Sequence, residues 1–252
     1  MKKTGIITLF FLAVTMIGFA FSGQTASAKT QKELVLKPNV EQKIQLDGKG
    51  KKETLLFTTT ETKKSVAEST YDITTKMILK INGKVVEKTT CVEKGVFEGY
   101  ESYPEVLVTD VNVKDKAKDI FFSYNTGKWC GSYKVLKHLQ YKKGKVIKDD
   151  MLKTFAKVKS KEINLLESNE GLKGDMSTAG KGILNWNVCI INNAIGYAHG
   201  TVPLKLVNSK FVIDKSNLSG VIKQVGSCVI GDGDFNNKVT FMKNLKVYKT
   251  VG

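Results

Sequence analysis

Short runs of β-branched and aromatic residues, divided by Gly, Asn, Asp or Lys, recur along almost the whole chain. TLLFTTT, KMILKINGKVVEK, PEVLVTDV and KDIFFSY are examples, and only three prolines occur in 252 residues. Such runs, bounded by turn formers, predict an all-β protein. Helical spacing is confined to DDMLKTFAKVKSKEINLLES, where Met151, Phe155, Val158 and Leu165 would share one face. We therefore expect at most one short helix, near residues 149–168.

Three stretches of the chain resemble one another: ILKINGKVVE at 78–87, LQYKKGKVIK at 139–148 and LKLVNSKFVI at 204–213. Each consists of an apolar strand, a small polar turn with lysine, and a second apolar strand, which predicts a β-hairpin. A recurring hairpin cannot bury its apolar face alone. We therefore predict antiparallel hairpin repeats that form a β-propeller-like array. The open alternative is that any antiparallel β-protein contains similar hairpins.

The N-terminus has the pattern of a secretory signal. Two lysines precede an apolar run from Ile6 to Phe21, and Ala26-Ser27-Ala28 follows. A basic start, an apolar stretch and an A-x-A site are typical of a signal peptide, with an uncleaved membrane anchor as the alternative. We expect residues 1–28 to be removed and residues 29–252 to form a single all-β repeat domain. This domain is predicted to be secreted, extracellular or cell-surface associated, with no integral membrane segment.

The chain is strongly basic. Its formal net charge is +16 at pH 7, of which two lysines belong to the predicted signal, so 16 − 2 leaves +14. Scattered lysine suits a diffuse polyanion, and the expected partner is an anionic cell-wall polymer or glycan. The alternative is that lysine only maintains solubility and protects strand edges. Nucleic acid is not expected, because no basic motif interleaved with aromatic residues occurs.

The four cysteines are Cys91, Cys130, Cys189 and Cys228. Spacings of tens of residues exclude the C-x-x-C pairs of a zinc site or a redox motif. In an exported protein, two disulfides could form in three connectivities. Buried free thiols are the other interpretation, and both stay open.

Two acidic loops precede apolar strands. IQLDGKGKKETLLF (44–57) places Asp47-Gly48 and Glu53 before a strand, and VTDVNVKDKAKDIFF (108–122) contains D-x-N-x-x-D before D-I-F-F. Over residues 44–148 this layout resembles the FG-GAP or VCBS-type repeats of secreted bacterial proteins. The resemblance implies an integrin-like β-propeller whose loops often hold calcium.

Lysines separate the acidic residues of these loops, and Lys114 stands where the family pattern has a third ligand. Calcium takes six to eight oxygen ligands, and an ammonium among them would repel the ion. Asp and Asn also favour turns without any metal. We therefore expect the loop 110–119 to be chiefly a strand connector, with no cofactor or only weakly bound calcium. The candidate ligands are Asp110, Asn112, Asp115 and Asp119, together with Asp232, Asp234 and Asn236 of GDGDFNN.

Aromatic residues in polar, turn-rich segments are the candidate binding residues: Tyr100, Tyr103, Trp129 and Trp186. Aromatic faces on loops stack on sugar rings or on partner side chains. Aromatic residues also cover core edges, which is the alternative.

The sequence contains no catalytic motif that we recognise, and His138 and His199 each lie outside one. The predicted function is a non-catalytic binding or surface-associated protein. One alternative is a secreted hydrolase that uses loop carboxylates among Asp110, Asp115, Asp119, Asp232 and Asp234. The other is a module that acts through contacts with other proteins. An isolated histidine is more often a satisfied structural residue than a general base.

Overall fold

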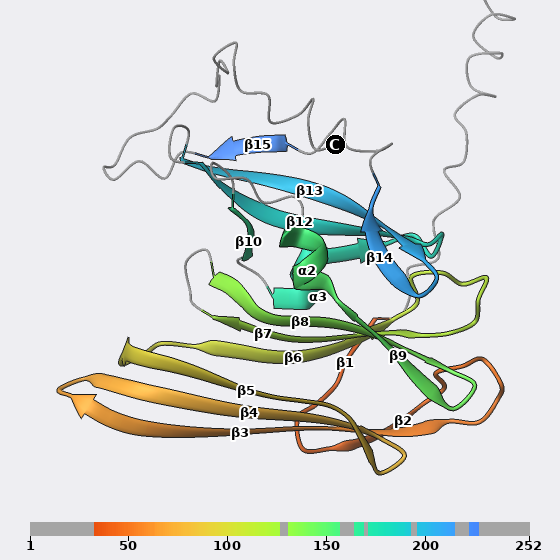
Figure 1. The fold of residues 1–252 in the computed structure, drawn as a ribbon, viewed down its shortest axis with the longest axis horizontal. Helices are drawn as coiled ribbons and strands as arrows, with labels where there is room; N and C mark the ends of the chain where they lie inside the picture. The colour runs from red at the N-terminus through yellow and green to blue at the C-terminus, as the bar shows by residue number, and fades with distance from the viewer. Residues whose placement is uncertain are drawn as a thin grey trace, which may run out of the picture. The chain divides into compact units, whose positions relative to one another are not determined.

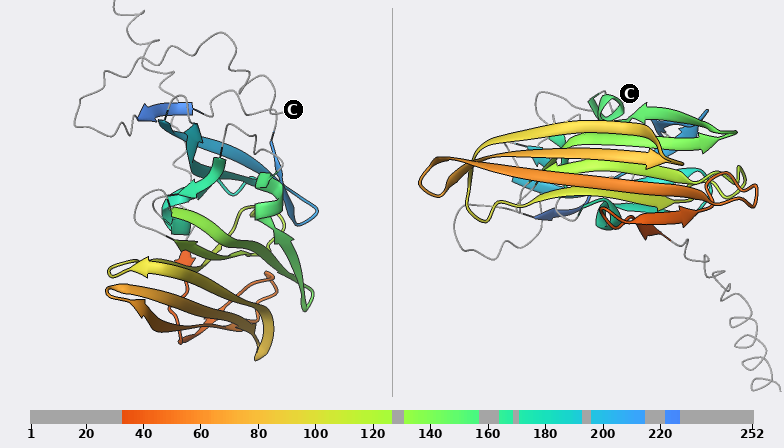
Figure 2. Two further views of the ribbon diagram at one scale, coloured as in Figure 1. Left: turned by 60° about the vertical axis from the view of Figure 1, so that its left-hand side comes forward. Right: turned by 90° about the horizontal axis from the view of Figure 1, so that it is seen from below.

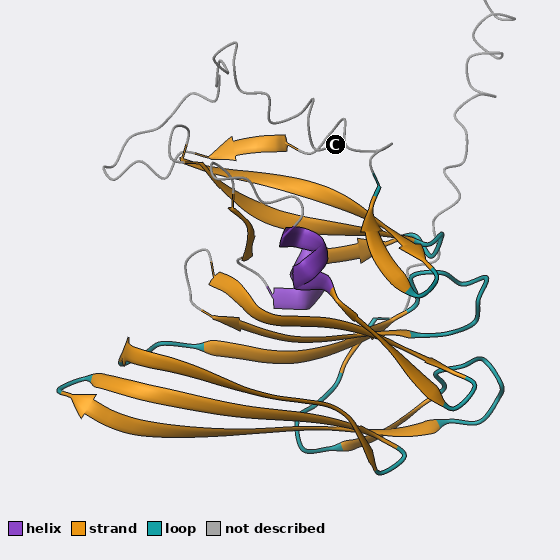
Figure 3. Cartoon of the chain, in the orientation of Figure 1, coloured by secondary structure: helices purple, strands orange, loops and turns teal. Residues whose placement is uncertain are grey.

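The structure is a computed structural model that describes residues 33–126, 131–156, 164–168, 171–192, 196–214 and 222–226 (Figure 1). Strands dominate these residues and two short helices occur among them (Figure 3). The all-β class is confirmed. No helix in the described part is long and apolar enough to cross a membrane.

The strands belong to two antiparallel sheets. The smaller sheet has the order β2-β3-β4-β5 and consists of β2 (Glu41–Ile44), β3 (Glu53–Ala67), β4 (Thr70–Ile81) and β5 (Lys84–Phe97). The larger sheet has eleven strands, with the main order β1-β6-β7-β8-β10-β12-β13-β14. Strand β9 pairs with β8, β11 with β12, and β15 with β13.

The strands of the larger sheet lie between Leu34 and Gly226 in the sequence. Its strands are β1 (Leu34–Val35), β6 (Ser102–Thr109), β7 (Asp119–Thr126), β8 (Gly131–Lys142), β9 (Lys145–Asp150), β10 (Asn164–Ser168), β11 (Met176–Thr178), β12 (Ile183–Asn192), β13 (Gly196–Val207), β14 (Lys210–Ile213) and β15 (Ile222–Gly226). The helices are α2 (Met151–Ala156) and α3 (Gly171–Asp175).

The three similar stretches of the sequence are hairpins, as predicted. They join β4 to β5, β8 to β9 and β13 to β14 through two-residue turns. Both residues of each turn have positive φ: Asn82 and Gly83 at 50° and 76°, Lys143 and Gly144 at 52° and 76°, and Asn208 and Ser209 at 50° and 63°. Positive φ at both positions defines the turn whose twist matches that of paired strands, and Asn-Gly is its preferred sequence.

Strand β7 is buried along its whole length because it lies between two cores. Phe122 and Tyr124 face the smaller sheet and pack in one cluster with Phe57 and Leu79. Phe121, which alternates with them, packs on the opposite side in a second cluster. Alternate side chains of a strand point to opposite faces, so one strand contributes to both cores.

The second core lies where the larger sheet folds back on itself. From β8 the pairing continues through β10 to β12, β13 and β14, and side chains from both halves meet in one cluster. Trp186 and Leu204 come from β12 and β13, whereas Leu136 comes from β8. Both short helices contribute one buried residue, Met151 and Leu172, and Figure 1 shows them between the two halves of the sheet.

Two finer expectations are wrong. The described residues form no propeller: the hairpins belong to two different sheets, because their apolar faces are covered by distant strands rather than by neighbouring copies. The second wrong expectation is that of at most one helix, because the described residues contain two. Helix α2 ends at Ala156, Leu165 lies in strand β10, and α3 begins at Gly171, beyond the predicted region. Val158 lies outside the described residues.

Candidate functional site

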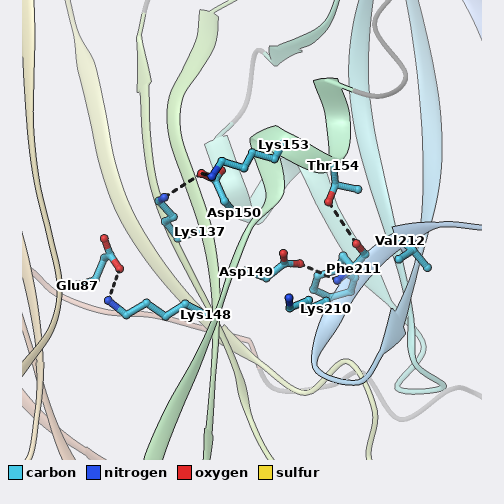
Figure 4. A pocket seen from close by; sticks show the side chains of 10 residues that line it. All are labelled: Glu87, Lys137, Lys148, Asp149, Asp150, Lys153, Thr154, Lys210, Phe211 and Val212. Atoms are coloured by element: carbon cyan, nitrogen blue, oxygen red, sulfur yellow. Dashed lines mark hydrogen bonds and ion pairs between the residues drawn. The ribbon is translucent and has the colours of Figure 1, made fainter.

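A groove of about 470 Å³ opens beside β9, α2 and β14 (Figure 4). The residues that line it are mostly charged: Glu87, Lys137, Lys148, Asp149, Asp150, Lys153, Thr154, Lys210, Phe211 and Val212. They come from β5, β8, β9, α2 and β14, which are far apart in the sequence. The groove is therefore a product of the tertiary structure.

The register of the β8–β9 hairpin builds one wall of the groove. Lys137 lies directly opposite Asp150 and His138 opposite Asp149. Opposed residues of an antiparallel pair lie side by side on one face, so the lysine and the carboxylate meet. Lys137 Nζ lies 3.0 Å from Asp150 Oδ2, and Lys153 Nζ lies 3.9 Å from the same oxygen.

Strand β5 of the smaller sheet also contributes to the lining of the groove. Glu87 Oε2 lies 3.0 Å from Lys148 Nζ, an ion pair that joins β5 to β9. The lysine side chain is half exposed, whereas the glutamate side chain is mostly covered. Exposed ion pairs contribute little free energy, so Lys148 can turn towards a ligand at low cost.

The floor of the groove is fixed by the backbone of Phe211. The N–H of Phe211 donates to Asp149 Oδ2 at 2.7 Å, and its carbonyl accepts from Thr154 Oγ1 at 3.3 Å. These bonds tie β14 to β9 and α2. The Phe211 ring is buried, so it offers no exposed face to a sugar.

Positive charge exceeds negative charge in the groove. Of the described residues, four lysines and three carboxylates line it, a balance of 4 − 3 = +1. All three carboxylates are already engaged, two with lysines and Asp149 with a backbone N–H. Lys210 forms no ion pair with any described residue, and no dashed line reaches it in Figure 4. The arrangement can accept an anionic group.

A buried polar network lies beneath the floor. Asp119 Oδ1 is 2.7 Å from His138 Nε2, and Asp119 Oδ2 accepts from the Val111 N–H at 2.8 Å. Gln140 Nε2 donates to both Asp119 and Asp115 at 3.2 Å. Asp119, His138 and Gln140 are fully buried, so this histidine is a core residue and not an accessible base; its Nδ1 has no hydrogen-bond partner among the described residues.

The His138 ring is also enclosed by aromatic residues. Its centroid lies 4.6 Å from that of Phe211 and 5.3 Å from that of Phe121. Phe211 thus separates the histidine from the groove. His199 lies in strand β13, opposite Cys189 in the register.

The loop 110–119 is a connector, as predicted, since β6 and β7 pair with each other on its two sides. Its acidic and amide side chains accept hydrogen bonds from donors of the chain itself. Asp110 accepts from Lys118 Nζ at 2.9 Å, Asp115 from Lys142 Nζ at 3.2 Å, and Asn112 Oδ1 from the Lys114 N–H at 3.3 Å. The described residues contain no group of three or more His, Cys, Asp or Glu that could hold a metal. Asp232, Asp234 and Asn236 lie outside the described residues.

The described residues among the predicted aromatic binding residues differ in burial. Trp186 is 2 % exposed and packs edge-on to Tyr133 at 5.2 Å, so it belongs to the core and not to a glycan site. Tyr103 is 41 % exposed and donates to Glu101, which raises the pKa of Tyr103. Tyr100 is half-buried, and this burial raises its pKa. Trp129 lies outside the described residues.

Cys91 is a buried free thiol. Burial, and then the nearby charge of Glu93, raise the pKa of Cys91 to about 11. Cys130 and Cys228 lie outside the described residues, as does the side chain of Cys189, so the disulfide expectation for them stays a prediction.

Sequence reasoning missed the groove. Asp149-Asp150 is a visible carboxylate pair, but nothing in the sequence indicates that Glu87 and Lys210 approach it. No protein-family model, no curated protein and no solved structure matches the chain. The resemblance to FG-GAP or VCBS-type repeats therefore stays a prediction.

Proposed function

We propose that this protein is exported and binds an anionic polymer of the cell wall or an anionic glycan, without catalysis, and that the groove receives one anionic group of that polymer. The observation that carries the proposal is the surplus lysine of the groove. Lys210 is free of ion pairs with the described residues, whereas every carboxylate there is engaged. The net charge of +14 that remains without residues 1–28 (16 − 2) adds a long-range attraction for polyanions.

The chemistry of the groove favours an anionic ligand over a neutral sugar. Among the described residues, Phe211 is the only aromatic one that lines the groove, and at 1 % exposure it cannot stack on a sugar ring. Its three carboxylates bind cations or a backbone N–H, which leaves none of them placed as a free acid or base. Ammonium groups that are half exposed, such as that of Lys148, bind anions as point charges.

The test is a binding assay on purified wall polymer at low and high salt, from about 0.05 M to about 0.5 M. Binding should weaken steeply as salt rises, because exposed charges act through screened fields. The double variant Lys148→Gln/Lys210→Gln should bind several-fold more weakly than Lys114→Gln/Lys181→Gln, which removes the same charge from exposed positions elsewhere. Equal binding by the two variants, or retention that does not depend on salt, would refute the proposal.

Export is tested separately by locating the full chain in cell fractions. The chain should be found in the medium or on the wall, shortened at its N-terminus. A chain found only inside the cell at full length would contradict this part of the proposal.

A further inference from the structure

The smaller sheet has two faces of opposite character. Its inner face supplies Phe57, Met77 and Leu79 to the core beneath β7, and all three are fully buried. The residues that alternate with them form the outer face, which no other described strand or helix covers. Figure 2 shows this sheet from below in its right-hand view, with the orange and yellow strands in front.

The strand register places the outer-face residues in rows across β3, β4 and β5. These rows are Leu56–Lys80–Val85, Thr58–Ile78–Lys88, Thr60–Lys76–Thr90 and Thr62–Thr74–Val92. Lys64 lies opposite Asp72 beyond the last row, and Lys43 of β2 lies opposite Thr54. Glu41 of β2 lies opposite Leu56. The face thus consists largely of lysine and threonine.

The outer face carries more positive than negative charge. It carries five lysines against Glu41 and Asp72, a balance of 5 − 2 = +3. Within the part of the chain that the structure describes, none of these lysines forms an ion pair. Asp72 already accepts a hydrogen bond from the Gly95 N–H at 3.0 Å. The lysines are therefore available to an external anion.

The threonines add neutral donors between these charges. Thr58, Thr60 and Thr90 flank Lys76 and Lys88 in adjacent rows. Of the outer-face hydroxyls, that of Thr62 donates to the Thr74 carbonyl at 3.5 Å. A hydroxyl donates one hydrogen bond, and phosphate oxygens accept several, so a phosphate can bridge an ammonium and a hydroxyl.

The spacing of the lysines suits a regular linear polyanion. Lys76 and Lys80 are four residues apart on one strand, about 14 Å, and Lys88 lies opposite Ile78, halfway between them on the next strand. The cations therefore advance in steps of about 7 Å along the strand. In a phosphodiester polymer with a three-carbon linker, six backbone bonds separate successive phosphorus atoms, a span of about 7 Å when extended.

We propose that the outer face of the β2–β5 sheet is a docking surface for a linear phosphodiester polymer with short polyol linkers. The inference rests on the proposed function only in that the partner is an anionic polymer. It places the main contact on a different surface from the groove. A sheet face suits an extended chain because contacts can repeat along the strands. The apolar residues Leu56, Ile78 and Val85 are separated by lysine and threonine, which does not form the continuous apolar face that a membrane surface requires.

The test is binding of the protein to synthetic poly(glycerol phosphate). The face variant Lys76→Gln/Lys80→Gln/Lys88→Gln should bind the polymer roughly tenfold more weakly than the parent protein. Each exposed contact is expected to contribute a factor of about two, and the three factors multiply. Its salt dependence should also become shallower. The matched control Lys114→Gln/Lys145→Gln/Lys181→Gln removes the same charge from exposed positions outside this face and should change affinity much less. Both variants should unfold at the temperature of the parent protein, because the substituted residues lie outside the core.

The outcomes separate this inference from the groove proposal. If the face and control variants bind the polymer with equal affinity, the proposed docking surface is wrong. That result would not bear on the groove. Loss in the face variant with none in Lys148→Gln/Lys210→Gln would support the docking surface and count against the groove. Tighter binding to vesicles containing phosphatidylglycerol than to the polymer would overturn the inference in favour of a membrane surface. A dimer that disappears in the face variant would overturn it in favour of a second copy.

Discussion

Strands β7 and β3 have similar β-rich sequences but opposite surroundings. Every residue of β7 is buried, whereas β3 buries alternate residues from Glu53 to Phe57 and is exposed from Thr60 onwards. The difference is that β7 lies between two cores and β3 covers only one. The number of layers that cover a strand, more than its local composition, therefore decides which polar residues the strand can contain.

The polar residues of the two strands show this rule. Asp119 of β7 is fully buried and receives hydrogen bonds from the chain on both carboxylate oxygens. Glu61 of β3 is exposed and forms one ion pair with Lys63 at 3.5 Å. A buried carboxylate without donors would cost several kcal/mol, whereas water can satisfy an exposed one.

The largest effects are expected from the apolar residues of β7. Phe121→Ala and Phe122→Ala should each lower the free energy of unfolding by about 4 kcal/mol, because each opens a cavity in a different core. Leu56→Ala, on the outer face of β3, should cost about 1 kcal/mol or less, since little apolar surface is lost there. Urea unfolding measures all three. A small effect of either phenylalanine substitution would show that β7 serves only one core.

A smaller effect is expected for the buried carboxylate. Asp119→Asn keeps the shape but places an amide among the donors from His138, Gln140 and Val111, and it should cost about 2–3 kcal/mol. The matched substitution Glu61→Gln should stay within about 0.5 kcal/mol. Equal costs would contradict the difference between the strands.

The burial of the inner face of the smaller sheet can be tested through the thiol of Cys91. Its raised pKa of about 11, caused first by burial, means that the folded state disfavours the thiolate. The thiol therefore contributes stability below its ordinary pKa of 9.0, and this contribution is lost as the pH rises towards 11. The stability difference between the parent and Cys91→Ser should shrink between pH 8 and pH 11. A constant difference would indicate a thiol open to solvent.

The smallest effects belong to the outer face. Thr60→Ala should change the free energy of unfolding by no more than about 0.5 kcal/mol, because the side chain is exposed and buries little area. Thr75→Ala, on the buried face of β4, should lower the free energy of unfolding by more than Thr60→Ala does. Thermal unfolding of the two variants compares the faces directly, and a larger loss at Thr60 would show that the outer face is covered.

Much of the local structure could be predicted from the sequence. The three hairpins were visible because Asn82-Gly83, Lys143-Gly144 and Asn208-Ser209 lie between apolar runs, and each turn contains Gly or Asn, which accept positive φ more readily than other residues. The connector role of the loop 110–119 followed from the apolar strands on either side. The candidate sites were harder, because a single aromatic or acidic residue does not reveal its burial: Trp186 proved to be a core residue and Asp119 a buried partner of His138.

The sequence by itself determined the all-β class and the tight turns, because strand alternation and turn chemistry act between near neighbours. Only the tertiary structure decided how the hairpins combine. The same hairpin pattern supplies β4–β5 to one sheet and β13–β14 to the other. The contact of Glu87 with Lys148, and that of Asp149 with the backbone of Phe211, each join segments that are about 60 residues apart (148 − 87 = 61 and 211 − 149 = 62). Such contacts depend on which apolar faces cover one another, and that choice is made by the packing of the whole chain rather than by any local pattern.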